Sequence, residues 1–498
     1  MITRMSKLPH KLYRAAQVRE LDRIAIEEFS IPGIELMTRA GEAAFAALRA
    51  RWPEARHIAV ICGAGNNGGD GFVVARLAHV AGFNVSLSLL AAAESLKGDA
   101  KRAYDAMVSA GVAPIELFPS SLGDVDVVVD ALLGTGLDRE VQGEWSDAIV
   151  AMNAAAAPVL AVDIPSGLNA DSGAVMGVAV CAAVTISFIA LKQGMLTAAG
   201  PDHCGEILFD GLAVPQAVYE KVMPAAHRID PRQFSTMLPR RARSTHKGDC
   251  GHVLVVGGAA GMSGAARMAG EAALRSGAGL VSIATAPQHA AHINLTRPEL
   301  MVHAIDRGDA LHPLLQKADV VAVGPGLGTS QWGMAMLDVV LSCDVPLVVD
   351  ADALNLLAIE LHMRDDWVMT PHPGEAARLL NVSSDEVQTD RFFAADAMQG
   401  KYGGVVVLKG CGSLVVDRDG VTSLCDAGNP GMAGGGMGDL LTGVIAALIA
   451  QGLDLADAAR FGVWLHATAA DRAAAHQGER GLLASDLMPH LRQLVNRS

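Results

Sequence analysis

Residues 429–443 read NPGMAGGGMGDLLTG, a glycine-rich loop that contains one carboxylate, Asp439. The apolar stretch LLTGVIAALIAQG, which starts at residue 440, follows at once and predicts a helix. Backbone N–H groups at a helix N-terminus bind phosphate, which a carboxylate repels. Asp439 therefore has two interpretations. It is either a base that accepts the proton of a hydroxyl attacking phosphorus, or a first-turn carboxylate that stabilises the helix dipole.

The composition indicates layered α/β domains. The chain has 498 residues, of which 51% are hydrophobic, 18% charged and only 4% aromatic, a mix that fits α/β layers better than an antiparallel sandwich. This length predicts two or more domains. The formal net charge is −14, and we interpret the short basic run PRRAR (239–243) as a solvated linker. We therefore expect no nucleic-acid partner.

The cysteines and the apolar stretches indicate a cellular compartment. The seven cysteines are scattered and form no CxxC pair, which favours reduced thiols over disulfides or zinc ligands. Residues 1–22 lack the apolar core of a signal peptide. Apolar stretches such as VVVDALLG and GVIAALIA are shorter than the roughly 18 residues of a membrane helix. We expect a cytoplasmic protein with no membrane partner.

Two series of apolar strands alternate with helical segments. The strands that carry the argument are HIAVICG (57–63), VDVVVDALLG (125–134), PVLAVDIPSG (158–167) and HVLVVGG (252–258). Continuous apolar strands between helices predict parallel sheets covered on both faces. The periodicity weakens between 213 and 247, where prolines gather. We place the domains at 1–228 and 229–498.

Three loops of the first domain follow three predicted strands: GAGNNGGDG (63–71), DALLGTGLDRE (130–140) and DIPSG (163–167). Loops at the carboxyl ends of parallel strands line one crevice, so their polar side chains can converge. Glycine amides suit a pyrophosphate, and Asn, Asp and Ser oxygens suit a hard cation. The GxGxxG fingerprint is absent, and for any single loop the alternative is a tight strand–helix turn.

NNGGDG, DALLGTGLDR, DIPSG and the upstream LMTRAG (36–41) resemble the NAD(P)H-hydrate epimerase domain over roughly residues 12–225. The resemblance implies a Rossmann-like three-layer α/β sandwich that interconverts the R and S epimers of hydrated NADH and NADPH. It implies contacts to the hydrated nucleotide from Asn66, Asn67, Gly68, Gly69, Asp70, Gly134, Thr135, Gly136, Leu137, Asp138, Arg139, Glu140 and Asp163. It also implies a potassium ion held by Asn67, Asp130 and Ser166.

The epimerase chemistry needs a proton-transfer group. Inverting the hydroxyl-bearing carbon requires removal and re-addition of water or a ring-opening step, and either route needs a carboxylate near the ring. We predict Asp163 for this role, with Asp70 as the alternative. Both lie in loops that the strand pattern brings to the same crevice.

The second domain also places glycine loops after predicted strands: GAAGMSGAA (258–266), GPGLG (324–328), TPHPGE (370–375) and KGCGS (409–413). All four can reach the crevice of Asp439. KGCGS offers a cation and backbone amides to a nucleotide. Asp350 and Asp352 can help to place a magnesium ion. His372, between two prolines, has the plainer interpretation of a turn residue.

HKGDCGHVLVVGG, GMSGAARMAGEAALRSGAGLV, TPHPGE and the glycine-rich motif resemble the ADP/ATP-dependent NAD(P)H-hydrate dehydratases, which have a ribokinase-like α/β fold, from about residue 240 to 495. The resemblance implies Ala266, Gly326, His372 and Asp439 at the hydrated nucleotide. It implies ADP contacts from Lys409, Gly410, Cys411, Gly412, Ser413 and Gly438. KGCGS stands where the family often has KGAGT, which keeps the amides. Ala433 replaces a frequent Thr or Lys and removes a side-chain contact.

Together the two resemblances follow the order of the bifunctional NAD(P)H-hydrate repair enzymes over nearly the whole chain. They imply epimerisation of the hydrates, then dehydration of the S form with ADP or ATP, in which phosphorylation turns the ring hydroxyl into a better leaving group. We favour ADP because bacterial-type members resemble ADP users. Two alternatives stay open, a small-molecule kinase that keeps the phosphate on its product and a non-catalytic nucleotide sensor. We also expect a homo-oligomer.

Overall fold

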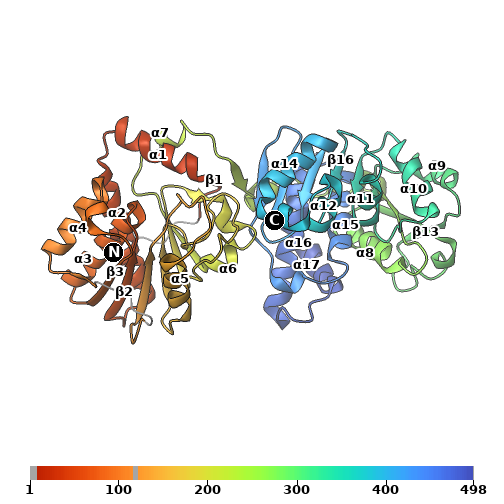
Figure 1. The fold of residues 1–498 in the computed structure, drawn as a ribbon. Helices are drawn as coiled ribbons and strands as arrows, with labels where there is room; N and C mark the ends of the chain where they lie inside the picture. Colours follow the sequence, from red (N-terminus) through yellow and green to blue (C-terminus); the bar gives the residue numbers. More distant parts are fainter. Residues whose placement is uncertain (1–7, 116–121, 497–498) are drawn as a thin grey trace. The chain divides into compact units, whose positions relative to one another are not determined.

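The computed structural model describes residues 8–115 and 122–496, and the chain divides into two compact units, Met1–His227 and Arg228–Ser498. Each unit contains a mainly parallel sheet with helices on its faces (Figure 1). The predicted α/β fold class is therefore confirmed. Within the described residues every helix is too short or too polar to cross a bilayer. All seven cysteines are free thiols.

The sheet of the N-terminal unit has the strand order β4-β3-β2-β5-β6-β7-β9, and every neighbouring pair is parallel. The strands are β2 (His57–Cys62), β3 (Asn84–Leu89), β4 (Pro114–Ile115), β5 (Val127–Ala131), β6 (Val159–Val162), β7 (Val184–Phe188) and β9 (Glu206–Asp210). The order reverses between β2 and β5. The loops that leave these two strands therefore flank the switch point at which ligands of open α/β sheets bind.

Side chains along each strand alternate between two cores. Val60 and Cys62 of β2 face one core, whereas Ala59 and Ile61 face the other. The first core is covered by α1 (Ala15–Glu27), α2 (Gly33–Arg51), α3 (Asn66–Val80) and α4 (Gly98–Ser109), and the second by α5 (Glu144–Ala154). The sheet is therefore buried on both faces, as the continuous apolar strands predict.

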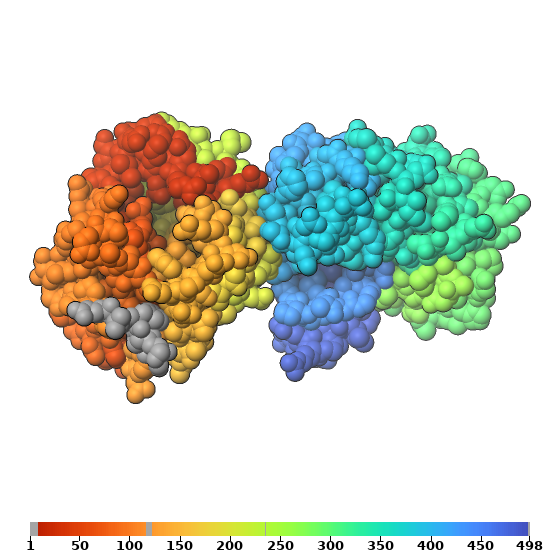
Figure 2. Space-filling view, viewed as in Figure 1, coloured from red at the N-terminus to blue at the C-terminus, as the bar shows by residue number. Residues whose placement is uncertain are grey.

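Three short strands join distant parts of the N-terminal unit: β1 (Lys11–Tyr13), β8 (Leu191–Lys192) and β10 (Ala226–Arg228). β1 pairs in parallel with β8 and antiparallel with β10. The short helix α6 (Gly200–Cys204) precedes β9, and the short helix α7 (Gln216–Tyr219) follows it. Helix α1 contacts α7, and the two segments lie side by side on the surface (Figure 2).

The sheet of the C-terminal unit runs β13-β12-β11-β14-β15-β16-β17-β18-β19. The strands are β11 (His252–Val256), β12 (Leu280–Thr285), β13 (Met301–Ala304), β14 (Val320–Val323), β15 (Leu347–Val349), β16 (Trp367–Met369), β17 (Val405–Leu408), β18 (Ser413–Val416) and β19 (Thr422–Cys425). The pairs are parallel up to β17, and β18 is antiparallel to both neighbours. Because β19 again runs in the direction of β17, the glycine-rich motif after β19 emerges at the edge where the other site loops emerge.

The helix predicted from the apolar stretch is confirmed as α15 (Met437–Ala450), which is buried along most of its length. The other helices are α8 (Ser263–Arg275), α9 (His312–Leu315), α10 (Gln331–Leu341), α11 (Ala351–Leu357), α12 (Pro373–Leu380), α13 (Ser384–Thr389), α14 (Arg391–Tyr402), α16 (Leu455–Gln477) and α17 (Met488–Leu494). Helix α15 packs tightly on α8, because a Cβ at Gly443 would lie 2.0 Å from the carbonyl oxygen of Ala269.

Gly443→Ala should destabilise the C-terminal unit, because the added methyl group meets a backbone oxygen in a close-packed core. We expect a loss of about 1–3 kcal/mol, measured by thermal unfolding of the full chain. The matched control is Gly400→Ala, an exposed position in α14 with open space around the new methyl group. Helix propensity should make the control neutral or more stable by up to about 1 kcal/mol. Equal melting temperatures for Gly443→Ala and the wild type would contradict the packing.

Candidate active sites

The N-terminus of α3 lies over the switch point of the first sheet because its glycines permit a close approach. A Cβ at Gly68 would lie 1.9 Å from the carbonyl oxygen of Gly63, and one at Gly69 would lie 2.5 Å from Cε of Met37. Neither position has room for a side chain. Asn66 and Asn67 open the helix, with Asn66 exposed and Asn67 buried.

Of the three residues predicted to hold potassium, Asn67 and Ser166 meet at the backbone carbonyl of Leu133, and Asp130 is hydrogen-bonded to Ser166. Asn67 Nδ2 donates to this oxygen (2.8 Å), and Ser166 Oγ lies 3.2 Å from it. Asp130 accepts hydrogen bonds from the hydroxyl (2.5 Å) and the N–H (2.8 Å) of Ser166. Burial raises the pKa of Asp130 to about 6. Asn67 Oδ1 is buried with no hydrogen-bond partner in the described part of the chain. This set of oxygens fits a cation.

Asp163 follows β6 in the left-handed backbone region, with φ of 67°. Its carboxylate is ion-paired with the fully buried ammonium of Lys192 and accepts the N–H of Phe188 (3.2 Å). Asp70 is half-buried one turn into α3. Burial, and then the charges of Asp163 and Asp22, raise the pKa of Asp70 well above its usual value. Sequence reasoning missed both Lys192 and Asp22.

The residues of the loop 134–140 differ in burial and in their contacts with the other site residues. A Cβ at Gly134 would lie 3.2 Å from Cβ of Asn67, so Gly134 adjoins the cation-binding oxygens. Thr135 is half-buried, Gly136 is exposed and Leu137 packs against the core under α5. Asp138, Arg139 and Glu140 are exposed, and their side chains make no hydrogen bond or ion pair with another described residue.

In the C-terminal unit Asp439 lies in the first turn of α15, which Gly436 caps with φ of 88°. Burial, and then the charge of Asp350, raise the pKa of Asp439 to about 6. A carboxylate that merely stabilised the helix dipole would be favoured in its charged form, and its pKa would be lowered. The raised pKa favours the interpretation of Asp439 as a base.

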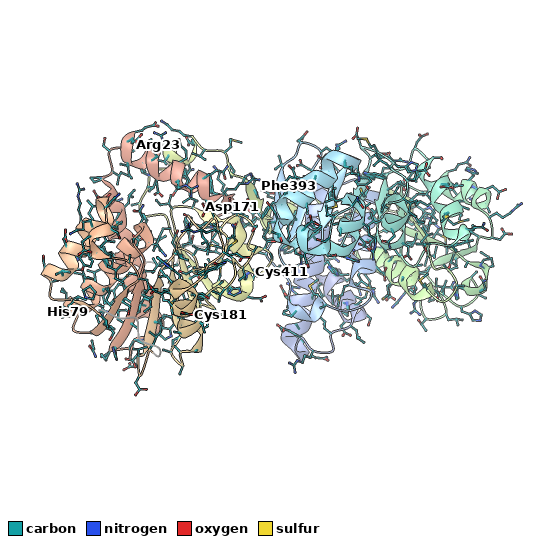
Figure 3. All side chains as sticks on the ribbon, in the orientation of Figure 1. Arg23, His79, Asp171, Cys181, Phe393 and Cys411 are labelled. Atoms are coloured by element: carbon teal, nitrogen blue, oxygen red, sulfur yellow. The ribbon has the colours of Figure 1, made fainter. Side chains whose placement is uncertain are left out.

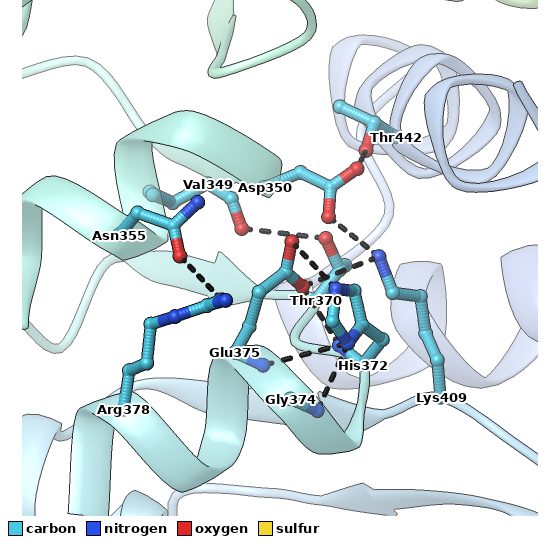
Figure 4. A network of polar contacts seen from close by, with 10 residues as sticks. All are labelled: Val349, Asp350, Asn355, Thr370, His372, Gly374, Glu375, Arg378, Lys409 and Thr442. Atoms are coloured by element: carbon cyan, nitrogen blue, oxygen red, sulfur yellow. Dashed lines mark hydrogen bonds and ion pairs between the residues drawn. The ribbon is translucent and has the colours of Figure 1, made fainter. Parts of the chain in front are cut away.

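Lys409 and Asp350 form a buried ion pair (Figure 4), and the charges of both act on the pKa of Asp439. Lys409 Nζ donates to one oxygen of Asp350 (2.7 Å), and the hydroxyl of Thr442 donates to the other (2.8 Å). Burial alone would raise the pKa of Asp350, but Lys409 lowers it. Burial alone would lower the pKa of Lys409, but the carboxylates of Asp350 and Glu375 raise it. A Cβ at Gly438 would lie 3.1 Å from Lys409 Nζ, so the ammonium adjoins the glycine loop.

His372 is an exposed residue that caps the N-terminus of α12. Its Nδ1 accepts the N–H groups of Gly374 (2.9 Å) and Glu375 (3.4 Å), and Glu375 Oε2 accepts its N–H (2.8 Å). The same Glu375 oxygen lies 3.8 Å from Lys409 Nζ. Burial, followed by the charge of Lys409, lowers the pKa of His372. His372 therefore borders the buried ion pair through Glu375 (Figure 4).

Ala266 and Gly326 lie around the N-terminal part of α8. Ala266 is fully buried, and a Cβ at Gly326 would lie 2.5 Å from the carbonyl oxygen of Met262. Asp352 links this region to Asp439. Its Oδ2 accepts the N–H of Gly328 (2.8 Å), and its negative charge contributes to the raised pKa of Asp439. Both oxygens of Asp350 and one of Asp352 are thus taken up by protein donors.

The predicted ADP loop, residues 409–413, connects β17 to β18. Arg391, which is buried, donates to the carbonyl oxygens of Leu408 (3.3 Å) and Lys409 (3.2 Å). Gly410 has φ of 137°, and a Cβ there would lie 2.8 Å from the guanidinium of Arg391. Cys411 is exposed (Figure 3), and the Ser413 hydroxyl donates to the carbonyl of Gly410 (3.0 Å). A buried arginine that the sequence did not single out thus supports this loop.

Two family models match the chain, one in each unit. The model described as YjeF-related protein N-terminus matches residues 33–194. The model described as NAD(P)H-hydrate dehydratase matches residues 253–493. The second match covers the Asp439 loop, the buried ion pair and the loop that Arg391 supports.

Individual proteins give the same result over the whole chain. It is 52% identical to the bifunctional NAD(P)H-hydrate repair enzyme of Coxiella burnetii, over 97% of this chain and 99% of the relative. It is 46% identical to the enzyme of that name from Escherichia coli, over 98% and 95%. The structure of a ribokinase-like superfamily protein from Enterococcus faecalis matches with 27% identity and a TM-score of 0.50, over 54% of this chain and 94% of its own.

The fold and the two sites define a two-domain α/β enzyme with a Rossmann-like first half and a ribokinase-like second half. The chain belongs to the bifunctional NAD(P)H-hydrate repair enzymes, with an epimerase domain followed by a dehydratase domain. The predicted family and activities are confirmed. The kinase and sensor alternatives are set aside, since the relatives that match both halves are repair enzymes.

The raised pKa of Asp439 predicts the pH dependence of dehydration. A base must be ionised, so kcat/KM for hydrated NADH should be constant above about pH 7 and fall about tenfold per pH unit below about pH 6. The assay follows the absorbance of reduced nicotinamide at saturating ADP. Asp352→Asn should move the fall to lower pH, because the negative charge of Asp352 raises the pKa of Asp439. A wild-type rate that stays constant down to pH 5 would contradict this assignment.

Proposed function

We propose that the dehydratase domain, residues 229–498, phosphorylates the ring hydroxyl of the S hydrate and then expels phosphate. Asp439 takes the proton of the hydroxyl as its oxygen attacks the terminal phosphorus of the nucleotide, and amides of the glycine loop hold the phosphoryl group. The ring-nitrogen lone pair then drives out phosphate, which leaves more readily than hydroxide. ADP yields AMP and phosphate, and ATP yields ADP and phosphate. The observation that carries this proposal is the half-buried Asp439 at the N-terminus of α15, with its raised pKa.

The nucleotide is proposed to bind through Lys409 to Ser413 and Gly438, and the hydrated ring through Ala266, Gly326, His372 and Asp439. Lys409 supports this assignment, because its ammonium adjoins Gly438. The hydrogen bond from Lys409 to Asp350 fixes the position of the ammonium before the nucleotide binds, so that its charge is ready for the phosphates. ADP stays the favoured co-substrate.

A magnesium ion is proposed to enter with the nucleotide phosphates. Mg²⁺ commonly binds phosphate oxygens and waters with only one or two carboxylates. The protein does not offer a ready-made site, since protein donors occupy both oxygens of Asp350 and one of Asp352. Within the residues that the structure describes, no group of three His, Cys, Asp or Glu residues could hold a metal ion.

The epimerase domain, residues 1–228, is proposed to bind hydrated NADH or NADPH over the N-terminus of α3, with Asp163 or Asp70 transferring protons. The substrate contacts are those predicted from NNGGDG, from 134–140 and from Asp163. A potassium ion is proposed between Asn67, Asp130 and Ser166, where a buried amide oxygen has no hydrogen-bond partner among the described residues.

The homo-oligomeric state and the cytoplasmic location of the protein stay predictions.

Asp439→Asn tests the proposed base, because the amide keeps the shape and cannot accept the proton. We expect kcat for dehydration to fall by about 10²–10⁴-fold with little change in KM for ADP. The matched control is Asp385→Asn, an exposed first-turn aspartate of α13, which should behave as wild type. Wild-type kcat in Asp439→Asn, or a stable phosphorylated product from the wild-type enzyme, would refute the proposal.

Potassium should stabilise the epimerase domain by binding its folded state. Exchange of Na⁺ for K⁺ at equal ionic strength should raise the melting temperature of the N-terminal unit and increase the rate of R-to-S conversion. Asp130→Ala should remove both effects, because it deletes the anionic ligand at the centre of the oxygen cluster. An Asp126→Ala control changes an exposed aspartate just before β5 and should keep the response to K⁺. The same response to K⁺ in Asp130→Ala would refute the assigned site.

A further inference from the structure

Lys192 lies outside every motif of the epimerase domain, yet its side chain is fully buried. Besides its ion pair with Asp163, the ammonium donates to the hydroxyl of Ser187 (3.1 Å) and lies 3.4 Å from the carbonyl oxygen of Phe188. An ammonium has three N–H donors, so these contacts fix its orientation. The Asp163 carboxylate, at 18% side-chain exposure, reaches the solvent side of the same pair.

The small sheet brings a further carboxyl group to this pair. Tyr13 of β1 lies opposite Lys192 of β8, and α1 begins two residues later. The N–H of Ala15, at the start of α1, donates to Asp171 (2.6 Å; Figure 3). Helix α1 is thus fixed to the segment that follows Asp163. Asp22 lies four residues after buried Val18 and one after buried Leu21, which places it at the buried face of this helix.

Two further carboxyl groups, Asp22 of α1 and Asp70 of α3, lie near enough to the Lys192–Asp163 pair for its charges to act on their pKa values. Burial, and then the charge of Asp163, raise the pKa of Asp22 to about 6, and burial followed by the charges of Asp163 and Asp22 raises the pKa of Asp70 well above its usual value. A structural ion pair needs only one carboxylate for its lysine. Extra carboxyl groups that are partly buried cost stability, and such groups occur mainly where chemistry uses them. The raised pKa of Asp70 favours its protonated form, as a proton donor requires, and the ammonium of Lys192 lies against the Asp163 carboxylate, as a positioned proton acceptor requires.

We propose that Lys192 is a positioning residue of the epimerase, which holds the Asp163 carboxylate as the proton acceptor while Asp70 acts as the proton donor. The inference rests on the proposed binding of the hydrate over the N-terminus of α3. It assigns separate roles to two aspartates that the sequence left as alternatives. It also adds a lysine that no motif contains.

The proton balance closes over one turnover. Asp70 gives its proton to the ring hydroxyl, the carbon–oxygen bond breaks, and the ring-nitrogen lone pair forms a carbon–nitrogen double bond as water leaves. A water molecule then adds to the opposite face of the same carbon, and the Asp163 carboxylate takes its proton. Transfer of that proton back to Asp70 through water restores both groups. No oxidant, reductant or nucleotide is consumed.

The test follows conversion of the R to the S hydrate by chromatography in the full-length enzyme without ADP, so that dehydration does not occur. Lys192→Met removes the charge and keeps the chain length. We expect kcat at pH 7 to fall about 100-fold, with KM within about threefold, because the ammonium no longer holds the Asp163 carboxylate in place. Lys192→Arg should keep at least a tenth of the activity. Lys101→Met, which changes a partly exposed lysine of α4, should match the wild type.

A pH profile separates catalysis from structure. The wild-type kcat should fall at high pH as Asp70 loses its proton. Asp22→Asn should move this fall to lower pH, because the negative charge of Asp22 raises the pKa of Asp70. Lys192→Met with wild-type kcat and pH profile would overturn the proposal. A second result would also overturn it: Lys192→Met and Lys192→Arg lose the same activity, and Asp22→Asn leaves the fall of kcat at high pH unmoved. That result would show that Lys192 has only a structural role. Absence of R-to-S conversion in the wild type would instead refute the proposed function.

Discussion

A buried lysine paired with an aspartate, beside a further carboxyl group of raised pKa, lies in each of the two proposed active sites. In the dehydratase the pair is Lys409 and Asp350, next to Asp439. In the epimerase it is Lys192 and Asp163, next to Asp70. Breaking one partner of a buried pair leaves an uncompensated charge, so each pair is costly to alter. Each pair fixes a charge beside a carboxyl group whose pKa is raised above its usual value.

The topology of each sheet makes these clusters possible. In the first unit the strand order reverses between β2 and β5, and in the second between β11 and β14. Loops that are distant in sequence then meet at the carboxyl edge of the sheet. Glycines bring α3 and α15 close to their neighbours, as the contacts at Gly68 and Gly443 show. The two domains thus have a similar arrangement of charged groups, although the proposed reactions differ. One inverts a carbon centre, and the other phosphorylates a hydroxyl group and then eliminates phosphate.

The sequence predicted the α/β class, the family, the helix after the glycine-rich motif and the grouping of Asn67, Asp130 and Ser166, because local patterns and strand-end loops carry that information. It did not reveal Lys192 or Asp22, since ALKQG and VRELD have no motif and meet only through the pairing of β1 with β8. The sequence also did not show that Lys409 forms an ion pair with Asp350, or that Arg391 donates hydrogen bonds to the 409–413 loop. Such long-range contacts depend on packing that local patterns do not encode.

The central claim is that each proposed site holds one carboxyl group of raised pKa beside a lysine–aspartate pair. Carbon-detected NMR titration of the full chain, labelled with ¹³C at aspartate carboxyl groups, measures this directly. Asp70→Asn and Asp439→Asn assign the two resonances by their disappearance. The account predicts that the Asp439 resonance titrates near pH 6 and that the Asp70 resonance titrates well above the usual aspartate range. Titration of both groups near the ordinary value of about 4 would contradict it.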